Sequence, residues 1–148
     1  MSLKNKKAPV FSLYDSDNQL HELEKYKGKK VLLVFYPGDD TAVCTKQLCS
    51  YNSGLDDFKE LGVQILGINQ DSLDSHKKFK EKYKLNFPLL SDPDGKICES
   101  YNAKSLFGTI KRSTFLINED STVVFENEVL PVFYKDREDI LKEIKKLL

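Results

Sequence analysis

Two cysteines five residues apart, Cys44 and Cys49, are the side chains of this sequence most suited to chemistry. They lie in the segment VLLVFYPGDDTAVCTKQLCSYN, residues 31–52. A cysteine thiolate is both a nucleophile and a metal ligand. The third cysteine, Cys98, is distant in sequence, so the three cannot all form disulfides. The close pair indicates redox chemistry rather than a structural staple, with metal binding as the alternative.

The elements around the pair place Cys44 at the start of a helix. Residues 31–36 are all apolar or aromatic, which predicts a strand buried on both faces, and Pro37 ends it. Asp39, Asp40 and Thr41 are candidate N-caps for a helix over residues 42–54. With Thr41 as N-cap, Cys44 is at N3, where unpaired N–H groups and the helix dipole favour its thiolate.

The same helix separates the two sulfur atoms. Five residues of α-helix rise roughly 7.5 Å and rotate about 140°, which puts the Cα atoms about 9 Å apart. A disulfide tolerates at most about 7 Å between Cα atoms. Cys44 and Cys49 therefore bond only if part of the helix unwinds, which indicates a catalytic cycle with a conformational step.

The rest of the chain predicts alternating strands and helices. Two short strands surround a turn at residues 15–18, and residues 86–94 form a loop. The other expected elements are strands at 63–68, 113–117 and 122–126, and helices from about 72, over 96–101 and over 136–147. In the last helix Ile140, Leu141, Ile144 and Leu148 form the predicted apolar stripe.

The central segment resembles a known family. Pro37, Thr41 and Cys44 match P-x-x-x-T-x-x-C, the signature of peroxiredoxins, and C-x-x-x-x-C resembles their bacterioferritin comigratory protein, or peroxiredoxin Q, subgroup. The similarity extends from about Pro9 to the last helix. It implies an α/β, thioredoxin-like fold in one domain, residues 1–148, with a central mixed sheet flanked by helices and an N-terminal β extension. The order of the predicted elements agrees with this fold.

The resemblance also implies roles for individual residues. Cys44 would be the peroxidatic cysteine and Cys49 the resolving one. Thr41 would bond the peroxide as well as cap the helix, and Pro37 would shield the pocket from water. Arg112 lies in a segment that resembles the family's R-x-T-F, where its guanidinium would stabilise the thiolate; neighbouring Lys111 is the alternative cation.

The implied reaction is thiol-dependent reduction of hydrogen peroxide and organic hydroperoxides. The Cys44 thiolate attacks a peroxide oxygen and becomes a sulfenic acid, and Cys49 condenses with it to a disulfide. A thioredoxin-like dithiol protein then reduces the disulfide. No cofactor and no metal is needed, because sulfur carries both electrons. The chain would act as a monomer or a weak homodimer.

Two positions depart from the usual family pattern. Ala42 stands where proline usually follows the threonine, but alanine is a good helix former, so we expect the helix to begin there. Gln47 stands where glutamate is usual. A glutamine can accept a bond from Arg112 but adds no charge to it. This change bears on the rate more than on the type of reaction.

Composition limits the classes of partner. The 148 residues carry 23 basic and 23 acidic side chains, so nothing indicates a nucleic-acid partner. There is no apolar run near 18 residues, which predicts no membrane partner. The basic N-terminus lacks the apolar region of a signal peptide, so we expect a cytoplasmic protein with reduced thiols.

Three other functions remain as alternatives. A metal module would use Cys44, Cys49 and Cys98, although no second C-x-x-C or H-x-x-x-H pair is present. A thioredoxin-type dithiol oxidoreductase would use C-x-x-C, which differs from the spacing here. A holdase chaperone is neither supported nor excluded. We expect Cys98 to be structural, and His21 and His76 to be surface or half-buried residues.

Overall fold

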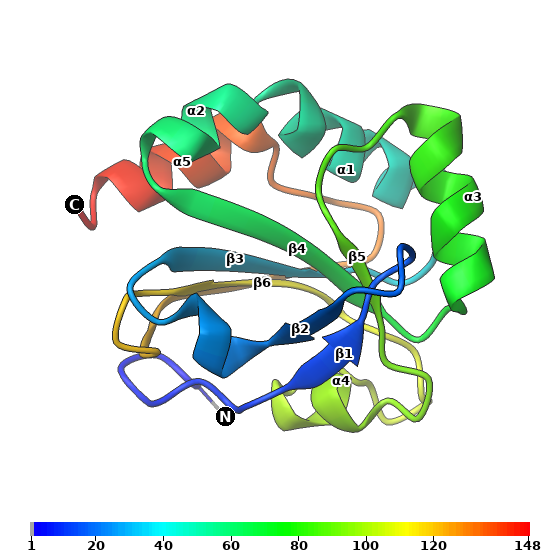
Figure 1. Ribbon diagram of the computed structural model, residues 1–148, viewed down its shortest axis with the longest axis horizontal. Coiled ribbons are helices and arrows are strands. Elements are labelled where there is room, and N and C mark those ends of the chain that lie inside the picture. Colours follow the sequence, from blue (N-terminus) through cyan, green and yellow to red (C-terminus); the bar gives the residue numbers. More distant parts are fainter. Residues whose placement is uncertain (1) are drawn as a thin grey trace.

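The computed structural model describes residues 2–148, which form a mixed sheet with helices on both faces (Figure 1). The strands are β1 (Ser12–Tyr14), β2 (Leu20–Glu22), β3 (Lys30–Phe35), β4 (Val63–Asn69), β5 (Leu89–Ser91), β6 (Arg112–Ile117) and β7 (Val123–Val129). The helices are η1 (Leu23–Tyr26), α1 (Ala42–Ser53), α2 (Leu55–Glu60), α3 (Leu73–Tyr83), α4 (Lys96–Ser100) and α5 (Arg137–Lys145).

Strand β3 lies at the centre of the main sheet, whose order is β5-β4-β3-β6-β7. It runs parallel to β4 and antiparallel to β6, with Phe35 opposite Ile68 on one side and Ser113 on the other. Residues 31–36 are fully buried because both faces of the sheet are covered. The predicted mixed α/β sheet is therefore confirmed, and so is the N-terminal β extension, which is the β1–β2 hairpin.

Two hydrophobic cores lie on opposite faces of the sheet. Helices α1, α2, α3 and α5 cover one face and pack on the even-numbered side chains of β3, including Leu32 and Val34. The β1–β2 hairpin, η1 and α4 cover the other face and pack on Val31, Leu33 and Phe35 (Figure 1). The alternation of side chains along a strand thus assigns each residue of β3 and β6 to one core.

The structure corrects three details of the predicted elements. The expected loop at residues 86–94 contains β5, which starts directly after Pro88. This strand pairs in parallel with residues 67–69 of β4. Helix α2 follows α1 as a separate helix after Gly54. The last helix ends at Lys145, so Leu148 lies beyond it and is exposed instead of extending the apolar stripe.

Candidate active site

Cys44 lies in the first turn of α1, just beyond the carboxyl end of β3. Thr41 is the N-cap with an extended backbone, φ −89° and ψ 153°, and its carbonyl accepts a bond from the Thr45 N–H at 2.8 Å. Cys44 is therefore at N3, as predicted, and its side chain is fully buried. The unpaired N–H groups of this turn favour negative charge on its sulfur.

Arg112 brings a positive charge to that sulfur. It is the first residue of β6, and its side chain points to the α1 face of the sheet, where it is buried. Its Nη1 donates to Cys44 Sγ at 3.2 Å and to Gln47 Oε1 at 2.7 Å. Its Nη2 donates to the Pro131 carbonyl at 3.0 Å. The guanidinium is thus held on two sides and can stabilise a thiolate at Cys44.

Lys111, the alternative cation, faces away from this site. Successive residues of a strand point to opposite faces, so Lys111 and Arg112 cannot both reach α1. The Lys111 ammonium lies 3.7 Å from the Glu128 carboxylate, in a half-exposed position. Of the two cations, Arg112 is therefore the one that contacts Cys44.

A chain of hydrogen bonds extends from Arg112 along one face of α1. Gln47 accepts from Arg112 through Oε1 and donates through Nε2 to the Tyr51 hydroxyl at 3.0 Å. The Tyr51 hydroxyl in turn donates to the Lys135 carbonyl at 2.7 Å. Burial raises the pKa of Tyr51, so the phenol keeps the proton that it donates. This chain joins α1 to the segment that precedes α5.

Thr41 and Pro37 lie in the loop that connects β3 to α1. The expected cap by the Thr41 side chain is wrong, because its hydroxyl donates to the Gly38 carbonyl at 2.9 Å and accepts no bond from the helix. The bond instead closes the loop on itself and leaves Thr41 exposed beside the helix start. Pro37 follows the buried Tyr36 and is half-buried, where it ends the pairing of β3. Both residues adjoin the turn that carries Cys44.

Cys49 lies in the same unbroken helix as Cys44, and both thiols are free. It is half-buried, and burial raises the pKa of its thiol, so it is a poorer nucleophile than a free thiol would be at neutral pH. Helix geometry places the two Cα atoms about 9 Å apart, beyond the reach of a disulfide. A disulfide between Cys44 and Cys49 therefore requires that part of α1 unwinds.

Cys98 belongs to the opposite face of the sheet. It is fully buried in α4 with the hairpin-side core, whereas Cys44 lies in the core under α1. Burial, together with the Asp92 carboxylate, strongly raises the pKa of its thiol. Among the described residues no group of three or more His, Cys, Asp or Glu side chains is placed to hold a metal ion. The three cysteines therefore do not form a joint metal site in this fold.

Comparison with known proteins gives one consistent result. The family model described as AhpC/TSA family matches residues 5–126. The chain is 44% identical to the bcp peroxiredoxin of Coxiella burnetii over 79% of its own length and 82% of that protein. It is 39% identical to chloroplastic peroxiredoxin Q of Oryza sativa subsp. japonica, over 86% of its own length and 61% of that protein.

A solved structure of Xanthomonas campestris peroxiredoxin Q superposes with a TM-score of 0.84 at 29% identity, covering 92% of this chain and 90% of that one. The chain belongs to the AhpC/TSA family. It is a peroxiredoxin, a thiol-dependent peroxidase, of the bacterioferritin comigratory protein or peroxiredoxin Q type. The thioredoxin-like fold implied by the sequence is confirmed by the same superposition.

Two departures of this peroxiredoxin from the common pattern have clear structural outcomes. Ala42 begins α1 without proline, so helix propensity is sufficient at that position. Gln47 makes the bond to Arg112 that was expected of it, and its amide also donates to Tyr51. A glutamate at this position would have no proton to donate to Tyr51.

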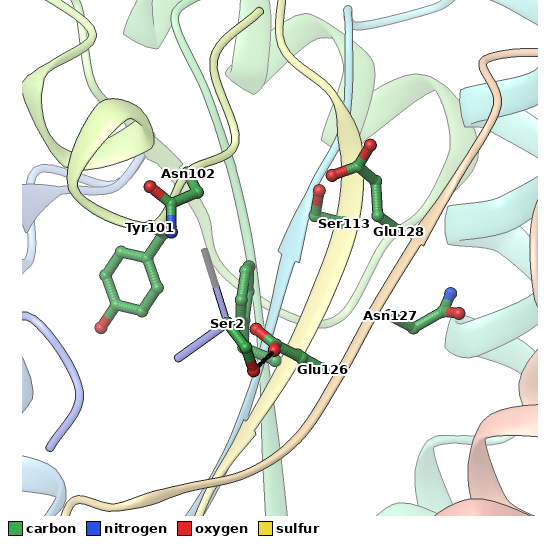
Figure 2. A pocket seen from close by; sticks show the side chains of 8 residues that line it. Ser2, Tyr101, Asn102, Ser113, Glu126, Asn127 and Glu128 are labelled. Carbon is green, nitrogen blue, oxygen red and sulfur yellow. Dashed lines mark hydrogen bonds between the residues drawn. The ribbon is translucent and has the colours of Figure 1, made fainter. Parts of the chain in front are cut away.

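A cavity elsewhere in the peroxiredoxin is separate from Cys44. It has a volume of about 330 Å³ and is lined by Ser113 and Phe115 of β6, with Glu126 and Glu128 of β7 (Figure 2). These β6 side chains point to the face opposite to Arg112. Glu126 is occupied by bonds from the Ser2 hydroxyl and the Leu3 N–H. The cavity therefore takes no part in the chemistry at Cys44.

Sequence reasoning missed a buried polar cluster behind the active-site loop. The interpretation of His76 as a surface or half-buried residue is wrong, because its ring is fully buried and bonds to Asp39. His21, in contrast, is half-buried as expected and bonds to Asp15 and Tyr26. The missed contact joins residues 37 positions apart, and no local pattern marks such a pair.

Proposed function

We propose that Cys44 is the peroxidatic cysteine of this peroxiredoxin and that Cys49 resolves it. The observation that carries the proposal is the Arg112 guanidinium 3.2 Å from Cys44 Sγ, at the N3 position of α1. A helix start and a buried cation together stabilise a thiolate, which is the nucleophile that the reaction needs. The alternative, in which Cys44 is only a small hydrophobic side chain, does not explain a charged donor aimed at its sulfur.

The reaction proceeds in three balanced steps. The thiolate attacks one peroxide oxygen, an S–O bond forms as the O–O bond breaks, and the leaving oxygen takes a proton to give water or an alcohol. The Cys49 thiol then displaces water from the Cys44 sulfenic acid, which forms the disulfide, and an external dithiol reduces it. Arg112 stabilises the charge that moves to the leaving oxygen. Its Nε is buried and has no hydrogen-bond partner within residues 2–148, so it is a further donor at the site.

Organic hydroperoxides are proposed as substrates beside hydrogen peroxide. The support is an apolar segment on both sides of Pro131, whose carbonyl holds Arg112. Leu130, Val132 and Phe133 are 67%, 70% and 58% exposed, respectively. Apolar side chains so close to the guanidinium suit an alkyl chain better than they suit water.

A dithiol protein of the thioredoxin type is the proposed reductant. Cys98 is on the other face of the sheet, so within residues 2–148 no third thiol is placed to reopen the Cys44–Cys49 disulfide. The electrons must then come from an external dithiol. Because both cysteines are on one chain, we propose that a monomer or weak homodimer suffices, in a reducing compartment such as the cytoplasm. Among residues 2–148, no helix is long and apolar enough to cross a membrane.

The decisive experiment compares Cys44→Ser with the unmodified chain. We expect the variant to lose peroxide consumption while its circular dichroism is unchanged, because serine keeps the packing but is a far weaker nucleophile. Mass spectrometry after one equivalent of peroxide should find the Cys44–Cys49 disulfide, and Cys49→Ser should stop at the sulfenic acid. Retained peroxidase activity in Cys44→Ser would refute the assignment. Insulin reduction, measured in parallel, detects a thioredoxin-type oxidoreductase instead.

A further inference from the structure

His76 of α3 lies beneath the loop that carries the start of α1, and both nitrogens of its ring are bonded. Nδ1 lies 2.6 Å from Asp39 Oδ2, and Nε2 lies 2.9 Å from the Leu90 carbonyl oxygen. The side chains of His76 and Asp39 are 0% and 3% exposed, so water does not compete for these bonds. None of the steps proposed above uses this pair.

The hydrogen-bond partners determine where the protons are. A carbonyl oxygen only accepts, so Nε2 must carry a proton for Leu90. Asp39 Oδ2 also accepts from the Ser75 hydroxyl, and Asp39 Oδ1 accepts from the Tyr36 hydroxyl at 2.6 Å. Every other partner of this carboxyl group donates to it and its pKa is lowered, which is the pattern of an ionised carboxylate, and an ionised carboxylate requires Nδ1 to donate as well. The His76 ring is therefore an imidazolium.

The charges around Asp39 agree with this assignment. Burial raises the pKa of Asp39, but the hydrogen bond and the charge of His76 outweigh it and hold the pKa below its ordinary value. A second carboxylate, that of Asp71, accepts from the Asp39 N–H at 2.8 Å and from Asn69 Nδ2 at 3.2 Å. The cluster thus holds two carboxylates and one imidazolium, with the neutral Tyr36 phenol between them and the core.

Cys44 is within electrostatic reach of this cluster. Burial raises the pKa of Tyr36, and the charges of Asp39, Asp71 and Cys44 raise it further. One phenol therefore senses the two carboxylates and the reactive sulfur together. A negative charge left unbalanced at Asp39 would disfavour the thiolate at Cys44.

The loop itself needs to be held. Asp40, between Asp39 and the N-cap, has φ 56°, which is unfavourable for a residue other than glycine. Its carboxylate accepts from Lys82 and from the Tyr83 hydroxyl, each at 2.9 Å. Lys82 and Tyr83, like Ser75 and His76, belong to α3, so this helix supplies two side-chain contacts to each of residues 39 and 40.

We propose that His76 is a positioning residue for the peroxidatic cysteine. As a buried imidazolium it fixes Asp39, and with it the loop that presents Thr41 and begins α1, and it balances the Asp39 charge so that Cys44 ionises. It touches neither the sulfur nor the peroxide and acts through Asp39. The inference rests on the proposed role of Cys44, and its test has a spectroscopic part that is independent of peroxidase activity.

The first test is nitrogen-15 NMR of the histidine side chains in the unmodified chain. We expect one ring, assigned to His76 by its loss in His76→Gln, to carry protons on both nitrogens in the native protein at neutral pH. A His76 ring with one bare nitrogen at neutral pH would overturn the proposal, whatever the variants do.

The second test follows the ultraviolet absorbance of the Cys44 thiolate against pH in a Cys49→Ser background. His76→Gln keeps a donor for Asp39 but removes the charge, so we expect the titration midpoint to rise by about one pH unit, a tenfold loss of thiolate on the acidic side. Adding Asp39→Asn should return the midpoint toward its original value. Lys77→Gln, an exposed neighbour on α3, is the matched control and should change nothing.

A merely structural His76 gives a different result. Loss of packing would lower the melting temperature of His76→Gln and leave the Cys44 titration midpoint unchanged. Adding Asp39→Asn would then lower the melting temperature further. The proposal would be overturned if the Cys44 titration midpoint were unchanged in His76→Gln. It would also be overturned if the midpoint of the double variant were displaced as far as that of the single variant. Failure of peroxide to oxidise Cys44 with the NMR result intact would overturn the proposed function alone.

Discussion

At the scale of single residues, the guanidinium that contacts Cys44 is itself held in place. Arg112 donates to Cys44, Gln47 and the Pro131 carbonyl at 3.2, 2.7 and 3.0 Å. The planar fork of arginine allows these bonds at once, whereas a lysine ammonium would be a single mobile point charge. The charge at the sulfur is therefore oriented as well as positive.

Arg112→Lys tests whether that orientation matters. We expect the second-order rate constant for oxidation by hydrogen peroxide to fall by about 100-fold, because a donor aimed at the leaving oxygen acts mainly in the transition state. Stopped-flow measurement of Cys44 oxidation gives the rate constant. Lys111→Gln, on the opposite face of the strand, is the control and should retain it. A rate within about twofold of the unmodified chain would show that charge alone is sufficient.

Gln47→Glu tests the second residue of the same network. A carboxylate one turn from Cys44 would repel the thiolate, so we expect the thiolate titration to move to higher pH. Compared at equal thiolate fraction, the reaction should be as fast or faster, because a charge-assisted bond holds Arg112 more firmly. Ultraviolet titration and stopped-flow oxidation give the two quantities.

In the structure, Gln47→Glu would also weaken a hydrogen bond of Tyr51. The introduced carboxylate and the Lys135 carbonyl would both be acceptors for the single Tyr51 proton, so the bond at 2.7 Å to Lys135 would weaken. A titration that moved to lower pH would mean that residue 47 does not act on the sulfur through its charge, despite its contact with Arg112.

At the scale of elements, the proposed reaction requires α1 to be a stable helix in one step and partly unfolded in the next. Cys44, Gln47, Leu48 and Tyr51 form its buried face, and the first two of them contact Arg112. Cys49 is half-buried, at the edge of this face. Since five residues of helix keep the two Cα atoms about 9 Å apart, disulfide formation must break hydrogen bonds between them.

Oxidation should therefore melt part of α1. We expect amide hydrogen exchange to accelerate over residues 46–51 after one equivalent of peroxide, and to return to its slow rate after reduction. The bond from Tyr51 to Lys135 should loosen with it, so residues 131–135 should also exchange faster. The control is Cys49→Ser, which forms no disulfide and should keep slow exchange. A Cys44–Cys98 crosslink in peptide maps would remove the resolving role from Cys49.

At the scale of the whole molecule, a buried carboxylate makes the stability of the fold depend on pH. Asp15, in the β1–β2 turn, pairs through its side chain with His21 at 2.7 Å, and its backbone forms a bridge to Leu90 of β5. Burial raises the pKa of Asp15, but bonds from His21 and from the Gln19 and Asp17 N–H groups outweigh it and leave the pKa lowered. The ionised side chain thus holds the turn of the hairpin together, and the backbone bridge attaches the hairpin to the main sheet.

This gives a defined pH dependence of stability. A carboxyl group whose pKa is lowered in the folded state contributes stability that is complete above its unfolded pKa, near 4, and is lost as the pH falls through the folded value. We expect the free energy of unfolding to decrease below about pH 4, and Asp15→Asn to make that decrease shallower. Urea unfolding at several pH values measures both. Asp74→Asn, at an exposed position, should leave the slope unchanged.

Local patterns in the sequence were enough to specify the layout of the central segment. Six apolar residues followed by proline specify a buried strand that stops, and the run of helix formers after residues 39–41 specifies a helix with Cys44 in its first turn. Those are local rules, so they hold without knowledge of distant residues. The placement of Cys44 and Cys49 in one helix followed from the same patterns and was correct, whereas the thioredoxin-like sheet was implied by the family resemblance.

Which distant side chains meet is a property of the folded molecule alone. Arg112 reaches Cys44 and Lys111 does not, because the pairing of β6 with β3 fixes which face each side chain takes. His76 was misjudged for the same reason: its burial and its charge come from Asp39 and Leu90, which only the packing of α3 brings to it. Local propensity carries no information on such contacts, since they depend on the register and packing of elements far apart in the chain.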